Sequence, residues 1–112
     1  MDIYHNPRCR KSRETLQLMR DAGVEPTVIE YLKTPPTEAE LKALLEKLGK
    51  APIDIIRKGE KVFKAEYKGR NLSDAEWIAA MAANPILMER PIVVSGNKAV
   101  LGRPPENVNE LL

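Results

Sequence analysis

Prolines and glycines divide this chain of 112 residues into short segments, and the order of those segments limits the folds available to it. Residues 2–5 are short and apolar and precede a breaker pair, which predicts a strand followed by a loop. Apolar residues at helical spacing predict a helix over residues 12–22. A second strand is expected over residues 27–29 with Tyr31. A strand, a helix and a strand in this order form a right-handed unit with two parallel strands.

The middle of the chain is predicted to be helical. Capping boxes at residues 37–40 and 73–76 mark the starts of two helices, and isoleucines after the first helix indicate a short helical turn. Residues 58–71 are polar and show no clear pattern. The buried face of the second helix is expected to contain Trp77, Ile78, Met81 and Ala82.

The last part of the chain predicts a hairpin and a helix. Residues 92–94 and 99–101 are apolar runs joined by a turn at 95–97. Pro104-Pro105 sets the first turn of a final helix. One side of that helix is expected to carry Val108, Leu111 and Leu112.

These elements predict an α/β fold of the thioredoxin-like plan. The two parallel strands and the hairpin give a mixed four-stranded sheet flanked by helices. Residues 37–84 form an all-helical insertion, and residues 1–112 form a single domain, which suits the usual size of a domain.

Composition argues against several classes of function. Lys and Arg number 18 against 16 for Asp and Glu, and the net charge of +2 is too small to predict binding to nucleic acid or to a membrane. Aromatic residues make up 4%, which is few for a surface that stacks bases. No apolar run approaches the roughly 20 residues of a membrane span, and the first residues do not resemble a signal peptide. We therefore expect a cytoplasmic protein.

Cys9 is the only cysteine, so no disulfide can form within the chain and a thiolate metal site lacks ligands. It falls in the predicted loop before the first helix, near free N–H groups and the positive end of the helix dipole. The basic residues around it are Arg8, Arg10, Lys11 and Arg13. Both effects favour the thiolate and predict a lowered pKa for Cys9. The alternative is an inert buried cysteine, which such a polar loop disfavours.

Two neighbours of Cys9 have alternative interpretations. Ser12 can donate a hydrogen bond to the thiolate, or it can be the N-cap of the helix, or both. His5 can tune or orient the thiolate, or it can be a packed, hydrogen-bonded histidine at the end of a strand. Because the chain has one cysteine, any adduct or disulfide of Cys9 must be resolved by an external thiol or a partner protein.

Three other arginines adjoin turn or breaker signals: Arg57, Arg90 and Arg103. A guanidinium group suits tetrahedral oxyanions, because its planar fork gives paired hydrogen bonds and stays charged. Spacing alone also fits scattered surface arginines. The Arg90-Pro91 peptide is either trans, as most X–Pro bonds are, or cis, as beside the thiol loop of thioredoxin folds.

The sequence resembles the glutaredoxin-coupled arsenate reductase (ArsC) family over essentially its whole length. Residues 4–9 and 12–15 are similar to the family's active-site signature. Residues 84–87, 90–94 and 102–104 are similar to its C-terminal signature. The chain is shorter than members of resistance operons and resembles the housekeeping branch.

The resemblance implies reduction of arsenate, or a similar oxyanion, on a thioredoxin-like fold. Cys9 matches the nucleophile that forms a thiol–arsenate adduct. Glutathione, as co-substrate, then displaces the adduct, and glutaredoxin resolves the mixed disulfide. The residues that match the oxyanion-binding arginines are Arg57, Arg90 and Arg103. The residues expected to support the thiolate are His5, Asn6 and Ser12. The resemblance also implies a cis peptide at Arg90-Pro91.

We expect a monomer with no metal and no tightly bound cofactor. The chain departs from some family members at Arg10 and Lys11, where they carry small or neutral residues. An alternative function is that of an Spx-like transcription regulator that binds RNA polymerase; Ser12 argues against the Cys-x-x-Cys switch of many such regulators. A second alternative is a glutathione-dependent thiol reductase of another substrate.

Overall fold

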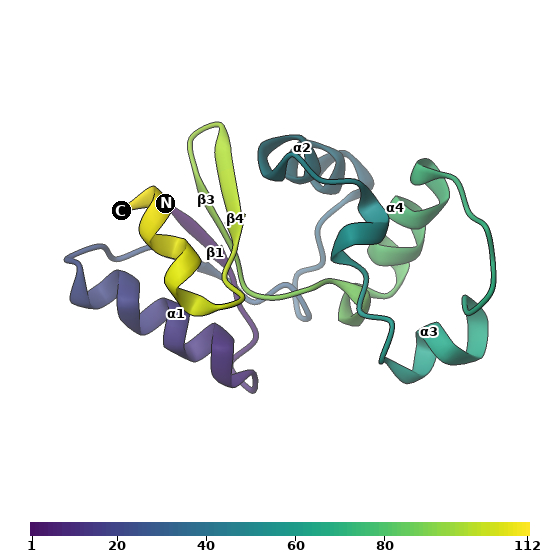
Figure 1. Ribbon diagram of the computed structural model, residues 1–112, viewed down its shortest axis with the longest axis horizontal. Helices are drawn as coiled ribbons and strands as arrows, with labels where there is room; N and C mark the ends of the chain where they lie inside the picture. Colours follow the sequence, from purple (N-terminus) through teal and green to yellow (C-terminus); the bar gives the residue numbers. More distant parts are fainter. The chain divides into compact units, whose positions relative to one another are not determined.

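The computed structural model describes all residues from Met1 to Leu112, and these form two compact units (Figure 1). The first unit contains Met1–Thr34 and Arg90–Leu112. The second unit contains Pro35–Glu89, so the helical insertion expected at residues 37–84 lies inside it. The assignment of residues 1–112 to a single domain stays a prediction.

The first unit is built on a four-stranded sheet of order β2-β1-β3-β4. Ile3 in β1 lies opposite Val28 in the parallel strand β2 and opposite Val93 in the antiparallel strand β3. A tight turn joins β3 to the antiparallel strand β4. The strands are β1 (Asp2–Tyr4), β2 (Thr27–Ile29), β3 (Ile92–Ser95) and β4 (Lys98–Leu101). The mixed sheet predicted from the sequence is therefore confirmed.

Two helices contribute to the core of this unit. The helix α1 (Arg10–Asp21) and the 3₁₀ helix η3 (Pro105–Leu111) lie next to one another, η3 being the yellow helix in Figure 1. The buried cluster that they form with β1 and β3 contains Ile3, Leu16, Met19, Val93 and Val108. Leu112 was expected on the same side as Val108, but its exposed fraction is 45%. The reason is the 3₁₀ geometry, which places residues 105, 108 and 111 on one face and leaves residue 112 off it.

The second unit is entirely helical, and both predicted capping boxes are present. The hydroxyl of Thr37 accepts a hydrogen bond from the N–H of Glu40 at 3.1 Å, and the hydroxyl of Ser73 accepts one from the N–H of Glu76 at 3.2 Å. These contacts start the two longest helices of the unit. Its elements are α2 (Glu38–Leu48), η1 (Pro52–Ile55), α3 (Lys61–Glu66), α4 (Asp74–Ala83) and η2 (Pro85–Leu87). No helix in the chain is long and apolar enough to span a bilayer.

The helix α3 was not predicted, because it lies within the segment that shows no clear pattern. It exposes most of its residues and buries Phe63, whose ring stacks on that of Trp77 with centroids 6.1 Å apart. One buried aromatic in six residues gives too weak a period to detect. The predicted face of α4 was also partly wrong, since Ala80 is buried whereas Ile78 and Ala82 are only half-buried.

Gly102 lies where two chain segments approach closely. A Cβ atom at this position would lie 2.8 Å from the Thr15 hydroxyl oxygen and 2.8 Å from Cγ of Pro91. We expect Gly102→Ala to lower the free energy of unfolding by about 1–3 kcal/mol, because Thr15 is fully buried and cannot move freely. Urea unfolding measures this effect.

The matched control for this substitution is Gly59→Ala. Gly59 has no heavy atom within 4 Å of a Cβ position and no positive φ, so we expect a change within about 0.5 kcal/mol. Equal unfolding midpoints for the two variants would contradict the close approach at Gly102.

Candidate active site

Cys9 lies at the start of α1, in a loop that Asn6 organises. The side-chain oxygen of Asn6 accepts a hydrogen bond from the N–H of Arg8 at 3.0 Å, and its backbone oxygen accepts one from the N–H of Cys9 at 2.9 Å. Asn6 is itself buried, and Arg13 ties the helix to the loop by donating to the Pro7 carbonyl at 3.0 Å. These contacts fix the backbone that carries the sulfur.

Cys9 is the N-cap residue of α1, with extended backbone angles of φ −92° and ψ 121°. The helix was expected to begin at Ser12, but it begins two residues earlier, at Arg10. Arg10 and Lys11 are good helix formers, and the Ser12 hydroxyl is engaged elsewhere and does not compete for the backbone. The interpretation of Ser12 as N-cap is therefore wrong.

Ser12 is fully buried and contacts His5 instead. Its hydroxyl oxygen lies 2.6 Å from Nδ1 of His5 and accepts a hydrogen bond from the N–H of Asn6 at 3.1 Å. Burial lowers the pKa of His5, and the charges of Arg20 and Arg13 add to this against the opposing effect of Glu30. The lowered pKa favours the neutral ring at pH 7, in which Nδ1 and the Ser12 hydroxyl share one hydrogen bond. These contacts connect the end of β1 to the first turn of α1 and so stabilise the loop between them. A direct effect of these side chains on the thiolate stays a prediction.

The thiol of Cys9 is half-buried and has a lowered pKa. Partial burial alone would raise the pKa, but the backbone N–H of Ser12, a hydrogen bond and the charge of Arg90, and the N–H of Lys11 together outweigh it. The N-cap position explains the backbone contribution, because the first N–H groups of a helix have no partner within the helix. The structure therefore gives the lowered pKa predicted from the sequence, with Arg90 as an unforeseen contributor.

Arg90 and Arg103 lie close together at the end of the sheet where β1 leads into the Cys9 loop. Arg103 donates from Nη1 to the backbone carbonyl of Arg90 at 3.1 Å. Both arginines precede a cis proline, Pro91 and Pro104. The cis peptide implied for Arg90-Pro91 is present, and the one at Arg103-Pro104 was not foreseen. The side-chain amide of Asn107 donates a hydrogen bond to the backbone carbonyl of Arg103 at 3.2 Å, a contact that was not predicted.

Arg57, the third predicted arginine, belongs to the helical unit and is paired with two carboxylates there. Its Nη1 lies 3.4 Å from Glu89 and its Nε lies 3.7 Å from Glu60. Hydrogen bonds from the N–H of Arg57 to Leu87 and from the N–H of Glu89 to Ile55 hold the two segments side by side. Neither carboxylate partner was predicted, although Glu60 lies only three positions after Arg57.

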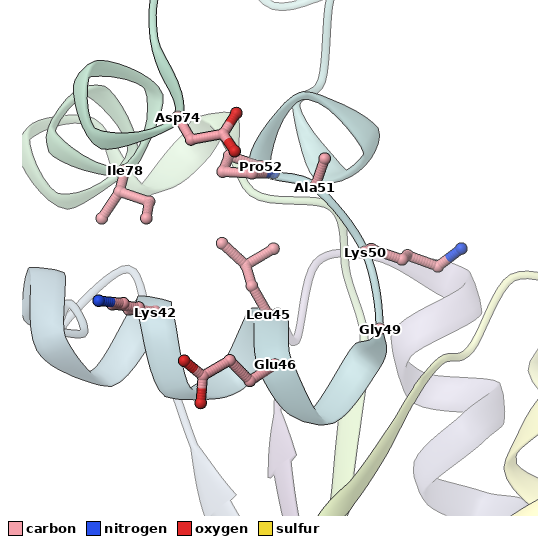
Figure 2. A pocket seen from close by; sticks show the side chains of 9 residues that line it. All are labelled: Lys42, Leu45, Glu46, Gly49, Lys50, Ala51, Pro52, Asp74 and Ile78. Carbon is pink, nitrogen blue, oxygen red and sulfur yellow. The ribbon is translucent and has the colours of Figure 1, made fainter.

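The helical unit also contains a hollow of about 410 Å³ between α2 and α4 (Figure 2). Leu45 and Ile78 point into it from the two helices, and charged side chains such as Lys42 and Asp74 lie around it. Its lining has no cysteine or histidine. This hollow therefore lacks the thiol that the predicted chemistry needs, because Cys9 lies in the other unit. No cluster of His, Cys, Asp and Glu in the chain could hold a metal ion.

A protein-family model decides the relationship of this chain to known proteins. The model of the ArsC family matches residues 4–111. The chain belongs to the ArsC family. This confirms the resemblance drawn from the two signatures, and the match includes the Cys9 loop and the cis prolines.

Relatives of this ArsC chain match it along its whole length. It is 50% identical to the uncharacterized protein YfgD of Escherichia coli K12, with 98% of this chain and 94% of the other covered. It is 44% identical to an arsenate reductase of Haemophilus influenzae, with 98% and 97% covered. A solved structure of an arsenate reductase from Vibrio cholerae is 48% identical, covers 100% of this chain and 98% of its own, and has a TM-score of 0.95. The thioredoxin-like fold is thereby confirmed.

Proposed function

We propose that this ArsC chain reduces arsenate to arsenite, with Cys9 as the nucleophile and external thiols as the source of electrons. The observation that carries the proposal is a sulfur at the N-cap of α1 whose thiolate is stabilised by Arg90 and by two backbone N–H groups. The names of several relatives, which are arsenate reductases at 41–45% identity, support the substrate. A cytoplasmic location and a monomeric state stay predictions.

The first step forms a bond between sulfur and arsenic. The Cys9 thiolate attacks As(V), and an arsenate oxygen leaves as water after taking up protons. Arsenic keeps its oxidation state in this step. Arg90 and Arg103 stabilise the negative oxygens of the adduct, because guanidinium groups donate paired hydrogen bonds and stay charged.

The second step transfers two electrons. The thiolate of glutathione attacks the Cys9 sulfur, the sulfur–arsenic bond breaks, and its electron pair stays on arsenic. Arsenic leaves as As(III), in arsenite, and Cys9 is left in a mixed disulfide with glutathione. A thiolate of glutaredoxin then attacks the glutathione sulfur and frees Cys9. The external thiols are required because the chain has no second cysteine.

The test is an assay that couples arsenate reduction to NADPH oxidation through glutathione reductase, glutathione and glutaredoxin. We expect a rate that depends on arsenate and on both thiol components. Phosphate, a tetrahedral anion that thiols do not reduce, should inhibit this rate without supporting one. A rate that does not respond to arsenate would contradict the proposal.

Arg57 gives a further prediction, because its carboxylate partners compete with any oxyanion for its guanidinium group. We expect Glu89→Gln to lower the KM for arsenate by about twofold to fivefold, since a half-buried pair of this kind contributes roughly 0.5–1 kcal/mol. The matched control is Glu46→Gln, an exposed position on α2 that makes no contact with Arg57. An unchanged KM in Glu89→Gln would mean that Arg57 does not bind the substrate.

A further inference from the structure

Four cationic residues surround Cys9 in the sequence, and all of them are exposed: Arg8, Arg10, Lys11 and Arg13. We call this set the cationic rim. Glu14 is the only acidic residue among its salt bridges, and it pairs with Arg10 at 2.9 Å. The rim therefore keeps an excess of positive charge next to the sulfur.

Two members of the rim have no fixed partner. The side chains of Arg8 and Lys11 make no hydrogen bond and no salt bridge, whereas Arg13 donates to the Pro7 carbonyl. No salt bridge has to break when an unpaired surface charge contacts a ligand. A local positive potential also raises the concentration of anions near it. Neither charge is needed to hold the loop, because the hydrogen bonds of Asn6 and Ser12 do so.

We propose that the cationic rim selects the small thiol that attacks at Cys9, favouring thiols with a net negative charge over neutral or cationic ones. This rests on the proposed function, in which Cys9 passes through a mixed disulfide. Glutathione, with two carboxylates and one ammonium group, has the favoured charge. Thiol–disulfide exchange at the same cysteine tests this preference: the attacking thiolate forms a new sulfur–sulfur bond, the bond to Cys9 breaks, and Cys9 leaves as a thiolate.

The experiment uses no arsenate, so its outcome does not depend on arsenate reductase activity. Cys9 is first capped as the mixed disulfide with 2-mercaptoethanol, by reaction with hydroxyethyl disulfide. Release of the free protein thiol is then followed by mass spectrometry with three reductants: 3-mercaptopropionate (anionic), 2-mercaptoethanol (neutral) and cysteamine (cationic). For each thiol, the ratio of variant to wild-type rate cancels the intrinsic reactivity of that thiol.

The variant is Arg8→Gln combined with Lys11→Gln, which removes the two unpaired charges. We expect the rate of Cys9 release by 3-mercaptopropionate to fall about threefold or more. The rate with 2-mercaptoethanol should change little, and the rate with cysteamine should rise. High salt should bring the variant and wild-type rates closer together for the charged thiols, because the rim charges are exposed and salt screens them. The control is Lys98→Gln, since Lys98 is exposed at the opposite end of the sheet from the Cys9 loop.

Two results would overturn the proposal. One is equal rate ratios for the three thiols, which would mean that the variant acts only through the leaving-group pKa of Cys9. The other is an equal effect of Lys98→Gln, which would mean that only net charge matters. A failed arsenate assay together with the expected thiol preference would instead point to a different oxidised substrate for the same site.

Discussion

Replacement of Cys9 by serine is expected to abolish arsenate-dependent oxidation of NADPH in the coupled assay. Serine keeps the shape of the site but supplies a hydroxyl with a much higher pKa, so almost no nucleophile is present at neutral pH. Serine also cannot form the disulfide that carries the electrons to arsenic. We therefore expect a loss beyond about 10⁴-fold, down to the rate without protein.

The control for this substitution is structural. Cys9 is half-buried and serine is close to cysteine in size, so Cys9→Ser should unfold at nearly the wild-type urea concentration. A serine side chain at an N-cap is itself favourable. A correctly folded variant that keeps a substantial arsenate-dependent rate would rule out Cys9 as the nucleophile.

Replacement of Arg90 by alanine is expected to have the second largest effect, a loss of about 10²- to 10³-fold in kcat/KM for arsenate. Arg90 has two roles in the proposed function, because it lowers the pKa of Cys9 and is proposed to stabilise the oxyanion as well. The variant should therefore also raise the pKa of Cys9 and move the rising limb of the pH–rate profile to higher pH.

Arg90→Lys separates the two roles of this residue. A lysine keeps the charge that supports the thiolate but loses the planar fork that pairs with an oxyanion. We expect it to restore most of the Cys9 pKa and only part of the rate. Arg103 donates to the backbone carbonyl of Arg90, so neither substitution removes that contact. Wild-type activity in Arg90→Ala would contradict the proposed site.

Local signals in the sequence were enough to predict the scaffold. The capping boxes at Thr37 and Ser73 and the β3–β4 hairpin are short-range patterns, and all are present. The predicted start of α1, Ser12, was two residues too late. The sequence does not reveal that the Ser12 hydroxyl is hydrogen-bonded to His5 rather than to the helix backbone. That contact joins residues seven positions apart and depends on the folded loop.

The candidate site was predictable in its residue types but not in its contacts. One cysteine among basic residues indicated a thiolate, and turn signals singled out the arginines. The pairing of Arg57 with Glu89 spans 32 positions, and the hydrogen bond from Arg103 to Arg90 spans 13. Such long-range contacts leave no periodic trace in a single sequence, so they could not be predicted from it.

The most direct test of the central claim is the rate of alkylation of Cys9 by iodoacetamide as a function of pH, with and without arsenate or sulfate. We predict a midpoint below that of an ordinary cysteine thiol, because the Ser12 and Lys11 N–H groups and Arg90 outweigh the effect of burial. Bound oxyanion should slow the alkylation. A midpoint at or above the ordinary value that oxyanions do not alter would contradict a thiolate held beside an oxyanion site.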